Sequence, residues 1–273
     1  PVLEYSERPE ETRRYLPWPR RNMRIPLDAS EASTARRHSS RWCSRSDCKG
    51  EVANDMDELR ELWERPGFQS GYRDWRSDRV AFAAGFEPEV ESFMAGCIDS
   101  KELSEKALAW KGQGFQGNGQ MFFDQLVRWF ETGELDLLLR DVLDPPVDGI
   151  SSELTLQHFR EAISEILLSG RGIEHRRVVV DGAIVPVGLP DLSTRRVNFF
   201  SSFFWGASHP DGWPVMFPSG RDALVKRNLL TRDLSEPELY SSYCYLIDGV
   251  KAQLGIDSWA VEFLLWELWR SSA

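Results

Sequence analysis

The chain has 273 residues, of which 41% are hydrophobic and 12% aromatic, including 11 Trp and 15 Phe. This composition supports a substantial buried core and excludes disorder along the whole chain. The formal net charge of −10 argues against a protein that coats nucleic acid non-specifically.

Residues 1–50 are predicted to form an extended N-terminal arm, because they are rich in Arg, Ser and Pro and show little apolar periodicity. Prolines such as Pro17 and Pro19 interrupt regular structure. Arginines interspersed with Trp18 and Trp42 suit phosphate contact and base stacking. The alternative is an arm that only wraps the surface of the protein.

Residues 51–150 hold most of the acidic excess and are predicted to form an acidic helical subdomain. A helix is expected from Asn54 to Pro66, because its apolar residues recur at spacings of three and four. Two short helices are expected over residues 87–110, with Asp99 or Ser100 as the N-cap of the second.

A glycine-rich segment follows, and we expect it to be a mobile loop ahead of two more helices. It contains Gly112, Gly114, Gly117 and Gly119. The first of these helices is expected to stop at Gly133. The second is expected to end before the proline pair 145–146.

Residues 151–273 are predicted to form a helical subdomain with a hairpin and a Trp-rich C-terminal core. A helix capped by Ser152 and ended by Gly170 precedes the hairpin. The hairpin has strands 178–180 and 184–187 around an Asp-Gly turn. Further helices complete the chain, and Pro214 and Pro218 are expected to bracket an extended segment.

The predicted fold is therefore mainly α: a multi-helix globular domain with one small β-hairpin and an extended N-terminal arm. Five tryptophans are expected to share one core near the C-terminus. They are Trp205, Trp213, Trp259, Trp266 and Trp269.

The glycine-rich segment matches the letters G-x-G-x-x-G over residues 112–117. No strong strand precedes it, and it lacks the G-K-[ST] ending of a P-loop. We therefore expect a hinge before a buried helix. A backbone contact to a phosphate at the start of that helix stays open as an alternative.

Motifs for metal binding and covalent catalysis are missing from the sequence. His38, Cys43 and Cys48 form a single cluster, whereas a zinc finger needs two. No G-x-S-x-G elbow occurs. We expect no metal site, no cofactor and no catalytic residue. The remaining enzymatic alternative is a pocket near His209, Asp211 and Arg221, where His and Asp would share a proton.

The four cysteines do not form the pattern of a disulfide framework, because only Cys43 and Cys48 are close in sequence. The chain also lacks the run of about 18 apolar residues that a membrane-spanning helix needs. We therefore expect a cytoplasmic protein that does not contact a membrane.

Small groups of basic residues are the remaining candidates for a site. If the hairpin and the helix after Ser219 share a face, these residues form a positive patch suited to DNA phosphates. The alternative is a solvated face whose cations pair with local acids. The candidates are Arg176, Arg177, Arg195, Arg196, Arg221, Lys226 and Arg227.

The last third of the chain carries a recognisable order of elements. An aromatic helix is followed by the turn "PDGWPVMFPS", a basic helix with Ala223 and Leu224, a Tyr-containing helix and the terminal stretch "LGIDSWAVEFLLWELW". Over residues 195–270 this order resembles the N-terminal helical region of McrB-like AAA+ restriction proteins. The positions that carry the terminal match are Leu254, Asp257, Phe263, Leu264, Trp266 and Leu268.

The resemblance implies a helical module that helps to recognise DNA or couples recognition to a restriction complex. The leading hypothesis is thus a non-catalytic DNA-binding or specificity module of a bacterial restriction or anti-phage defence system. The alternative is a protein-interaction scaffold for an AAA+ ATPase or nuclease subunit.

Overall fold

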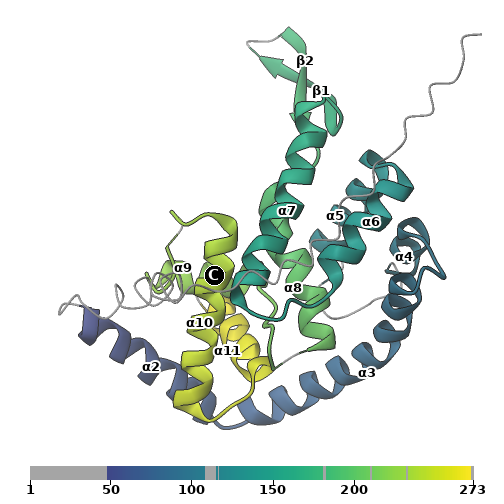
Figure 1. Cartoon of the computed structure of the whole chain (residues 1–273). Helices are drawn as coiled ribbons and strands as arrows, with labels where there is room; N and C mark the ends of the chain where they lie inside the picture. Colours follow the sequence, from purple (N-terminus) through teal and green to yellow (C-terminus); the bar gives the residue numbers. More distant parts are fainter. Residues whose placement is uncertain are drawn as a thin grey trace, which may run out of the picture. The chain divides into compact units, whose positions relative to one another are not determined.

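The computed structural model describes residues 48–107, 115, 117–180, 183–209, 211–231 and 233–271 (Figure 1). The backbone divides into two units, Pro1–Lys49 and Gly50–Ala273, and nearly all described residues belong to the second. The predicted N-terminal arm lies outside the described residues, except that residues 48–50 begin a helix.

The described chain is mainly α with a single antiparallel hairpin, which confirms the predicted fold class. None of its helices is long and apolar enough to cross a membrane. The elements are α2 (Cys48–Glu64), α3 (Phe68–Met94), α4 (Ser100–Ala107), α5 (Asn118–Trp129), α6 (Thr132–Leu143), α7 (Gly149–Leu168), β1 (Ile173–Val180), β2 (Ala183–Pro190), the short 3₁₀ helix η1 (Thr194–Arg196), α8 (Val197–Ser208), α9 (Pro218–Lys226), α10 (Glu236–Leu254) and α11 (Ser258–Arg270).

Helix α3 is one continuous helix, so the short helix predicted just before Asp99 is wrong. It contains Pro88, which removes one backbone hydrogen bond and ordinarily bends or breaks a helix. Phe86, Val90 and Phe93 around the proline are all buried. Their packing offsets the loss, since most helix stability in proteins comes from a buried apolar face.

Two helix starts show how carboxylates cap backbone N–H groups. Asp99 Oδ1 accepts a hydrogen bond from the Glu102 N–H at 2.8 Å, as one of the two predicted caps. The prediction that Ser152 caps the start of α7 is wrong. The cap is Asp148, whose Oδ1 accepts from the Ser151 N–H at 2.7 Å. Asp148, four positions before Ser152, thus satisfies one of the first free N–H groups of the helix.

Helix α5 ends at Trp129, and its C-cap residue is Phe130. The prediction that this helix ends at Gly133 is therefore wrong. Gly133 is instead the second residue of α6. Residues 112–114 of the predicted glycine-rich loop lie outside the described residues. At the start of α5, Gly117 has a φ of +86°, a conformation that favours glycine. A Cβ on Gly119 would lie 2.6 Å from the ring of Phe115, so glycine is also required there for space.

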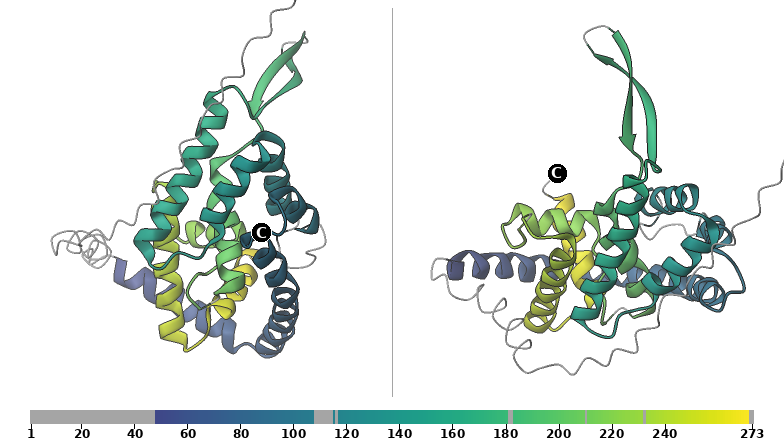
Figure 2. Two further views of the ribbon diagram at one scale, coloured as in Figure 1. Left: turned by 45° about the vertical axis from the view of Figure 1, so that its right-hand side comes forward. Right: turned by 45° about the horizontal axis from the view of Figure 1, so that its top comes forward.

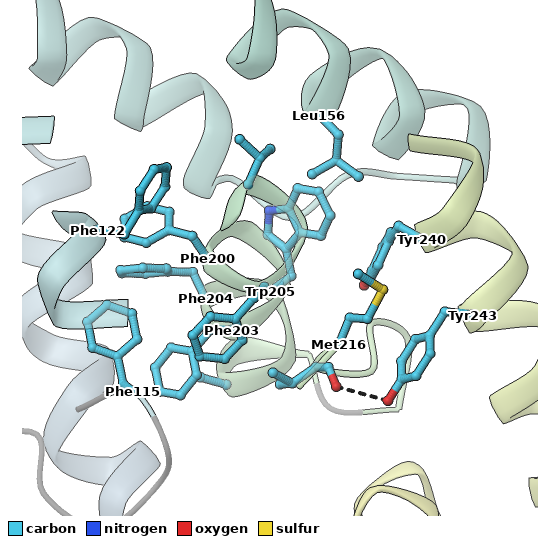
Figure 3. Packing of buried hydrophobic residues seen from close by; sticks show 14 of the residues in the cluster. Phe115, Phe122, Leu156, Phe200, Phe203, Phe204, Trp205, Met216, Tyr240 and Tyr243 are labelled. Atoms are coloured by element: carbon cyan, nitrogen blue, oxygen red, sulfur yellow. Dashed lines mark hydrogen bonds between the residues drawn. The ribbon is translucent and has the colours of Figure 1, made fainter. Parts of the chain in front are cut away.

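Helix α8 lies at the centre of the core. All its residues from Val197 to Ala207 are buried, including the polar Asn198, Ser201 and Ser202. Figure 3 shows its phenylalanines meeting rings from other helices, with Phe200 at 5.3 Å from Phe122 between ring centroids. Trp205 Nε1 donates to the Val142 carbonyl at 2.9 Å, which satisfies its polar group.

The segment between Pro214 and Pro218 is extended, as predicted, and Pro218 begins α9. Several of its buried backbone groups are paired with side chains. Tyr240 of α10 donates its hydroxyl to the carbonyl of residue 214 at 3.1 Å. Tyr243 of α10 donates to the carbonyl of residue 215, also at 3.1 Å, as the dashed line in Figure 3 marks. The Met216 N–H donates to a serine of α8 at 3.0 Å. This pairing fixes an irregular segment inside the core.

The tryptophans do not share one core, so this prediction is wrong in part. Trp205 packs with Trp213 in the main cluster, at 5.7 Å between ring centroids. Trp259 belongs to a second, smaller cluster. Trp266 and Trp269 are 39% and 41% exposed. Apolar spacing in α11 identifies a helix but does not say which side of it meets the core.

The hairpin is confirmed and is longer than predicted. Strands β1 and β2 pair antiparallel over eight residues each, with Arg177 opposite Pro186 and Ile173 opposite Pro190. The predicted turn residues 181 and 182 lie outside the described residues. Figures 1 and 2 show the hairpin extending beyond the end of α7 as a two-stranded ribbon. We call this feature the ribbon below.

The main hydrophobic cluster draws on residues along the whole of the second unit. It joins Leu59 and Phe93 with Ile163 and Leu264. Residues 51–150 and 151–273 thus contribute side chains to the same buried cluster.

Candidate nucleic-acid interface

The predicted basic residues do not form a single patch, because some of them pair within the fold. Arg227 is the clearest case. Its guanidinium binds both carboxylate oxygens of Glu58 on α2, with Nη2–Oε1 at 2.8 Å and Nη2–Oε2 at 3.1 Å. The Arg227 side chain is only 16% exposed. This arginine therefore links α9 to α2 and is poorly placed for a phosphate.

Arg196 binds a side chain of α5. Its Nη1 donates to Gln125 Oε1 at 3.2 Å, and Gln125 in turn donates to Asp191. Lys226 at the end of α9 is exposed and takes part in an interaction of its own. These two predicted candidates are therefore engaged locally.

Arg195 and Arg221 both act electrostatically on a carboxylate that the sequence did not single out. Glu236 begins α10, and burial raises its pKa above the usual range. The positive charges of Arg160, Arg221 and Arg195 act in the opposite direction. No ion pair joins any of the three to Glu236 among the described residues, so these arginines act on the carboxylate at longer range. We call the three arginines the Glu236 cluster.

Asn198 fixes the carboxylate in this position. The Asn198 side-chain amide donates to Glu236 Oε2 at 3.1 Å and also to the Glu236 carbonyl. Asn198 is fully buried in α8. The carboxylate is thus held from inside the protein, and the three arginines that act on it lie on α7, η1 and α9.

Arg160 of the Glu236 cluster was missed by sequence reasoning. It follows the buried Phe159 in α7, where an arginine reads as an ordinary solvated helix residue. Its Nε atom is buried and has no hydrogen-bond partner. No sequence signal could have found it, because the cluster joins residues from four separate elements.

The ribbon carries two more predicted candidates at successive positions of β1. Arg177 is exposed, opposite Pro186. Arg176 pairs with Val187 through the backbone, and its side chain lies outside what the structure describes. Glu174 is the single acidic residue in either strand, and Arg128 of α5 binds it at 2.8 Å. The described part of the ribbon is therefore locally cationic.

The ribbon and the Glu236 cluster are connected along the chain. Helix α7, which carries Arg160, leads directly into β1, and β2 leads into η1 with Arg195. Arginines on the ribbon, at its base and along α7 thus lie on neighbouring elements.

The enzymatic alternative near His209 finds no shared geometry. His209 and Asp211 are both exposed, and no hydrogen bond joins them to each other or to Arg221 within the described residues. The His209 carbonyl instead accepts from two backbone N–H groups of the turn. Arg221 binds its neighbour Asp222, with Nη2–Oδ1 at 2.9 Å.

Comparison with known proteins does not add an identity. No family model, curated protein or solved structure matches the chain.

Proposed function

We propose that this chain is a non-catalytic DNA-binding module whose ribbon lies in a groove of the duplex. The observation that carries the proposal is the ribbon, which extends beyond α7 and exposes Arg177. Glu174, the one acidic residue of its two strands, is paired with Arg128. The major groove of B-form DNA admits a two-stranded β-ribbon. Arginines on such a ribbon and at its base are positioned for phosphate contact.

The Glu236 cluster supplies the second set of contacts. The positive charges of Arg160, Arg195 and Arg221 all act on Glu236, and Arg221 also binds Asp222. Phosphate oxygens accept hydrogen bonds from arginine more strongly than neutral acceptors do. We propose that Arg195 and Arg221 contact the DNA backbone beside the groove that the ribbon enters.

The net charge of −10 limits how tightly this surface binds. A few cations on an acidic protein are expected to give affinity that falls steeply with salt, because phosphate contacts release counterions. The resemblance of residues 195–270 to McrB-like proteins supports a specificity role within a bacterial restriction or anti-phage system.

The test is binding of a fluorescent DNA duplex, followed by anisotropy at several salt concentrations. The Arg177→Ala/Arg195→Ala variant is expected to bind more weakly and to lower the slope of log K against log salt by about 2, roughly one per phosphate contact. Arg270→Ala is the matched control, because it removes an exposed arginine on α11, and it should bind as the wild type. No binding at low salt, or equal losses in all variants, contradicts the proposal.

A second candidate function is a protein-interaction scaffold, and a specific observation favours it. Trp266 and Trp269 lie three residues apart on α11 and are 39% and 41% exposed. Exposed aromatic side chains are enriched at protein interfaces. The test is a pull-down with the product of the gene adjacent to the one that encodes this chain. Loss of that binding in Trp266→Ala/Trp269→Ala, with DNA binding unchanged, would support this role.

A further inference from the structure

The two edges of the ribbon differ in the backbone groups that they offer to a further strand. In an antiparallel pair, opposite residues alternate between bonding to each other and pointing their N–H and C=O groups outward. At the base of the ribbon the Asp191 N–H donates to the Gly172 carbonyl at 2.7 Å. This hydrogen bond sets the alternation. The next pair, Ile173 and Pro190, therefore points outward, and so does every second pair beyond it.

Strand β2 is protected along its outer edge. Pro186 and Pro190 both fall at outward-pointing positions, opposite Arg177 and Ile173. Proline has no N–H group, so neither position can donate to a neighbouring strand. Proline on an edge strand is one of the means by which proteins prevent unwanted strand pairing. Strand β2 is therefore a poor template for a third strand.

The outer edge of β1 lacks this protection. Its outward-pointing positions include Ile173, His175 and Arg177, and each of them keeps its N–H group. Within the part of the chain that the structure describes, no hydrogen bond reaches the outward backbone groups of these three residues. His175 and Arg177 are exposed, and the ribbon extends beyond α7, so this edge is open to a further strand (Figure 2).

The sequence of β1 makes a second copy of this chain a suitable partner. Two β1 strands related by a two-fold axis run antiparallel, and outward-pointing residues then lie opposite each other. With His175 on the axis, Glu174 of each copy lies opposite Arg176 of the other. Opposite charges across a strand pair are stabilising. Moving the axis by one residue in either direction places Glu174 or Arg176 opposite itself, which is destabilising.

We propose that two copies of this chain associate through the outer edges of their β1 strands, which run antiparallel with His175 on the two-fold axis. The joined strands satisfy each other's outward N–H and C=O groups, as when an extended strand adds to the edge of a sheet. A two-stranded ribbon alone is only marginally stable in water, and added strands stabilise it. The major groove admits a ribbon of two strands, so the paired copies are a state that is not bound to DNA.

The experiment is sedimentation equilibrium of the full chain without DNA, over a range of concentrations, which should show a monomer–dimer equilibrium. His175→Pro should raise the dimer Kd by at least about ten-fold, because each copy loses a donor at the joined edge. The N–H of residue 175 points away from β2, so the ribbon should still form, as it does with Pro186 and Pro190. His175→Thr is the matched control, because it keeps the N–H group, and it should dimerise as the wild type.

Charge reversal tests the alignment of the two strands. Glu174→Arg places arginine opposite Arg176 of the second copy and should weaken the dimer. Glu174→Arg/Arg176→Glu restores opposite charges across the axis and should recover the dimer, although the contact of Glu174 with Arg128 stays lost.

Near-ultraviolet circular dichroism checks that each variant is folded. A chain that stays monomeric at every concentration, an equal Kd for His175→Pro and His175→Thr, or a double reversal that dimerises no better than Glu174→Arg would overturn the proposal. These measurements contain no DNA, so their result is independent of the DNA-binding proposal.

Discussion

At the scale of single residues, the ion pair between Arg79 and Glu262 is buried inside the fold. Arg79 donates to Glu262 Oε2, and both side chains are almost fully buried. The guanidinium also stacks on Trp75 and Trp259, with centroid distances of 5.0 and 4.8 Å. Glu262 Oε1 accepts from the Val215 N–H at 2.7 Å, so one carboxylate joins α3, α11 and the extended segment.

Replacing Arg79 with Met should destabilise the fold by about 3–5 kcal/mol at neutral pH, because it leaves Glu262 buried and unpaired. Burial already raises the pKa of Glu262, and losing the arginine raises it further. A carboxyl whose folded pKa lies above the unfolded value stabilises the fold at low pH and loses that contribution as pH rises through the folded pKa. The deficit should therefore be smaller at pH 5 than at pH 7.

Urea unfolding at the two pH values measures this difference, with Arg79→Met/Glu262→Met as the control. The double variant removes both charges and should recover much of the stability at pH 7, so its deficit should not grow between pH 5 and pH 7 as that of Arg79→Met does. An equal deficit for Arg79→Met at both pH values would show that Glu262 does not carry the pH dependence.

At the scale of elements, the contact between α8 and the extended segment depends on a glycine. A Cβ on Gly206 would lie 2.7 Å from the Trp213 carbonyl oxygen and 2.6 Å from a methyl group of Val215. Side chains larger than hydrogen cannot fit without moving backbone. The close approach holds the segment against α8 in the position where the tyrosines of α10 bind it.

Gly206→Ala should therefore lower the melting temperature, although alanine is the better helix former. Gly249→Ala on α10 is the matched control, because no atom lies within 4 Å of its Cβ position. There the change should stabilise by roughly 0.5–1 kcal/mol. Thermal unfolding of both variants gives the comparison, and a Gly206→Ala protein as stable as Gly249→Ala would rule out the steric argument.

Much of this element level could be predicted from the sequence. The periodicity of apolar residues gave α2, α7 and the hairpin, because spacing and turn residues are local signals. Helix ends were less reliable. Asp148 rather than Ser152 caps α7, and Pro88 lies inside α3, because packing decided between local alternatives that propensity could not separate.

At the scale of the whole molecule, residues 50–273 share one main hydrophobic cluster. The rings of α5 pack on α8, with Phe123 at 5.4 Å from Phe200 between centroids. Phe86 of α3 meets Phe204 of α8 at 5.3 Å. Residues 51–150 thus bury their aromatic side chains against residues of the second half.

A fragment of residues 51–150 should therefore fail to form fixed tertiary structure, whereas residues 50–273 should unfold in a single cooperative transition. Helical signal in far-ultraviolet circular dichroism without near-ultraviolet signal is the expected result for the fragment. Calorimetry of the longer chain provides the comparison. A cooperative melt of the fragment alone would indicate that residues 51–150 are an independent subdomain.

The sequence by itself determined the mainly helical class, the hairpin and the extended segment between Pro214 and Pro218, because periodicity, turn residues and proline act over a few residues. It also placed arginines beside the hairpin. Only the tertiary structure separated them: Arg227 binds Glu58, while Arg195 and Arg221 join Arg160 around Glu236. Whether a cation is engaged or available depends on partners brought from distant parts of the chain, and no local pattern records them.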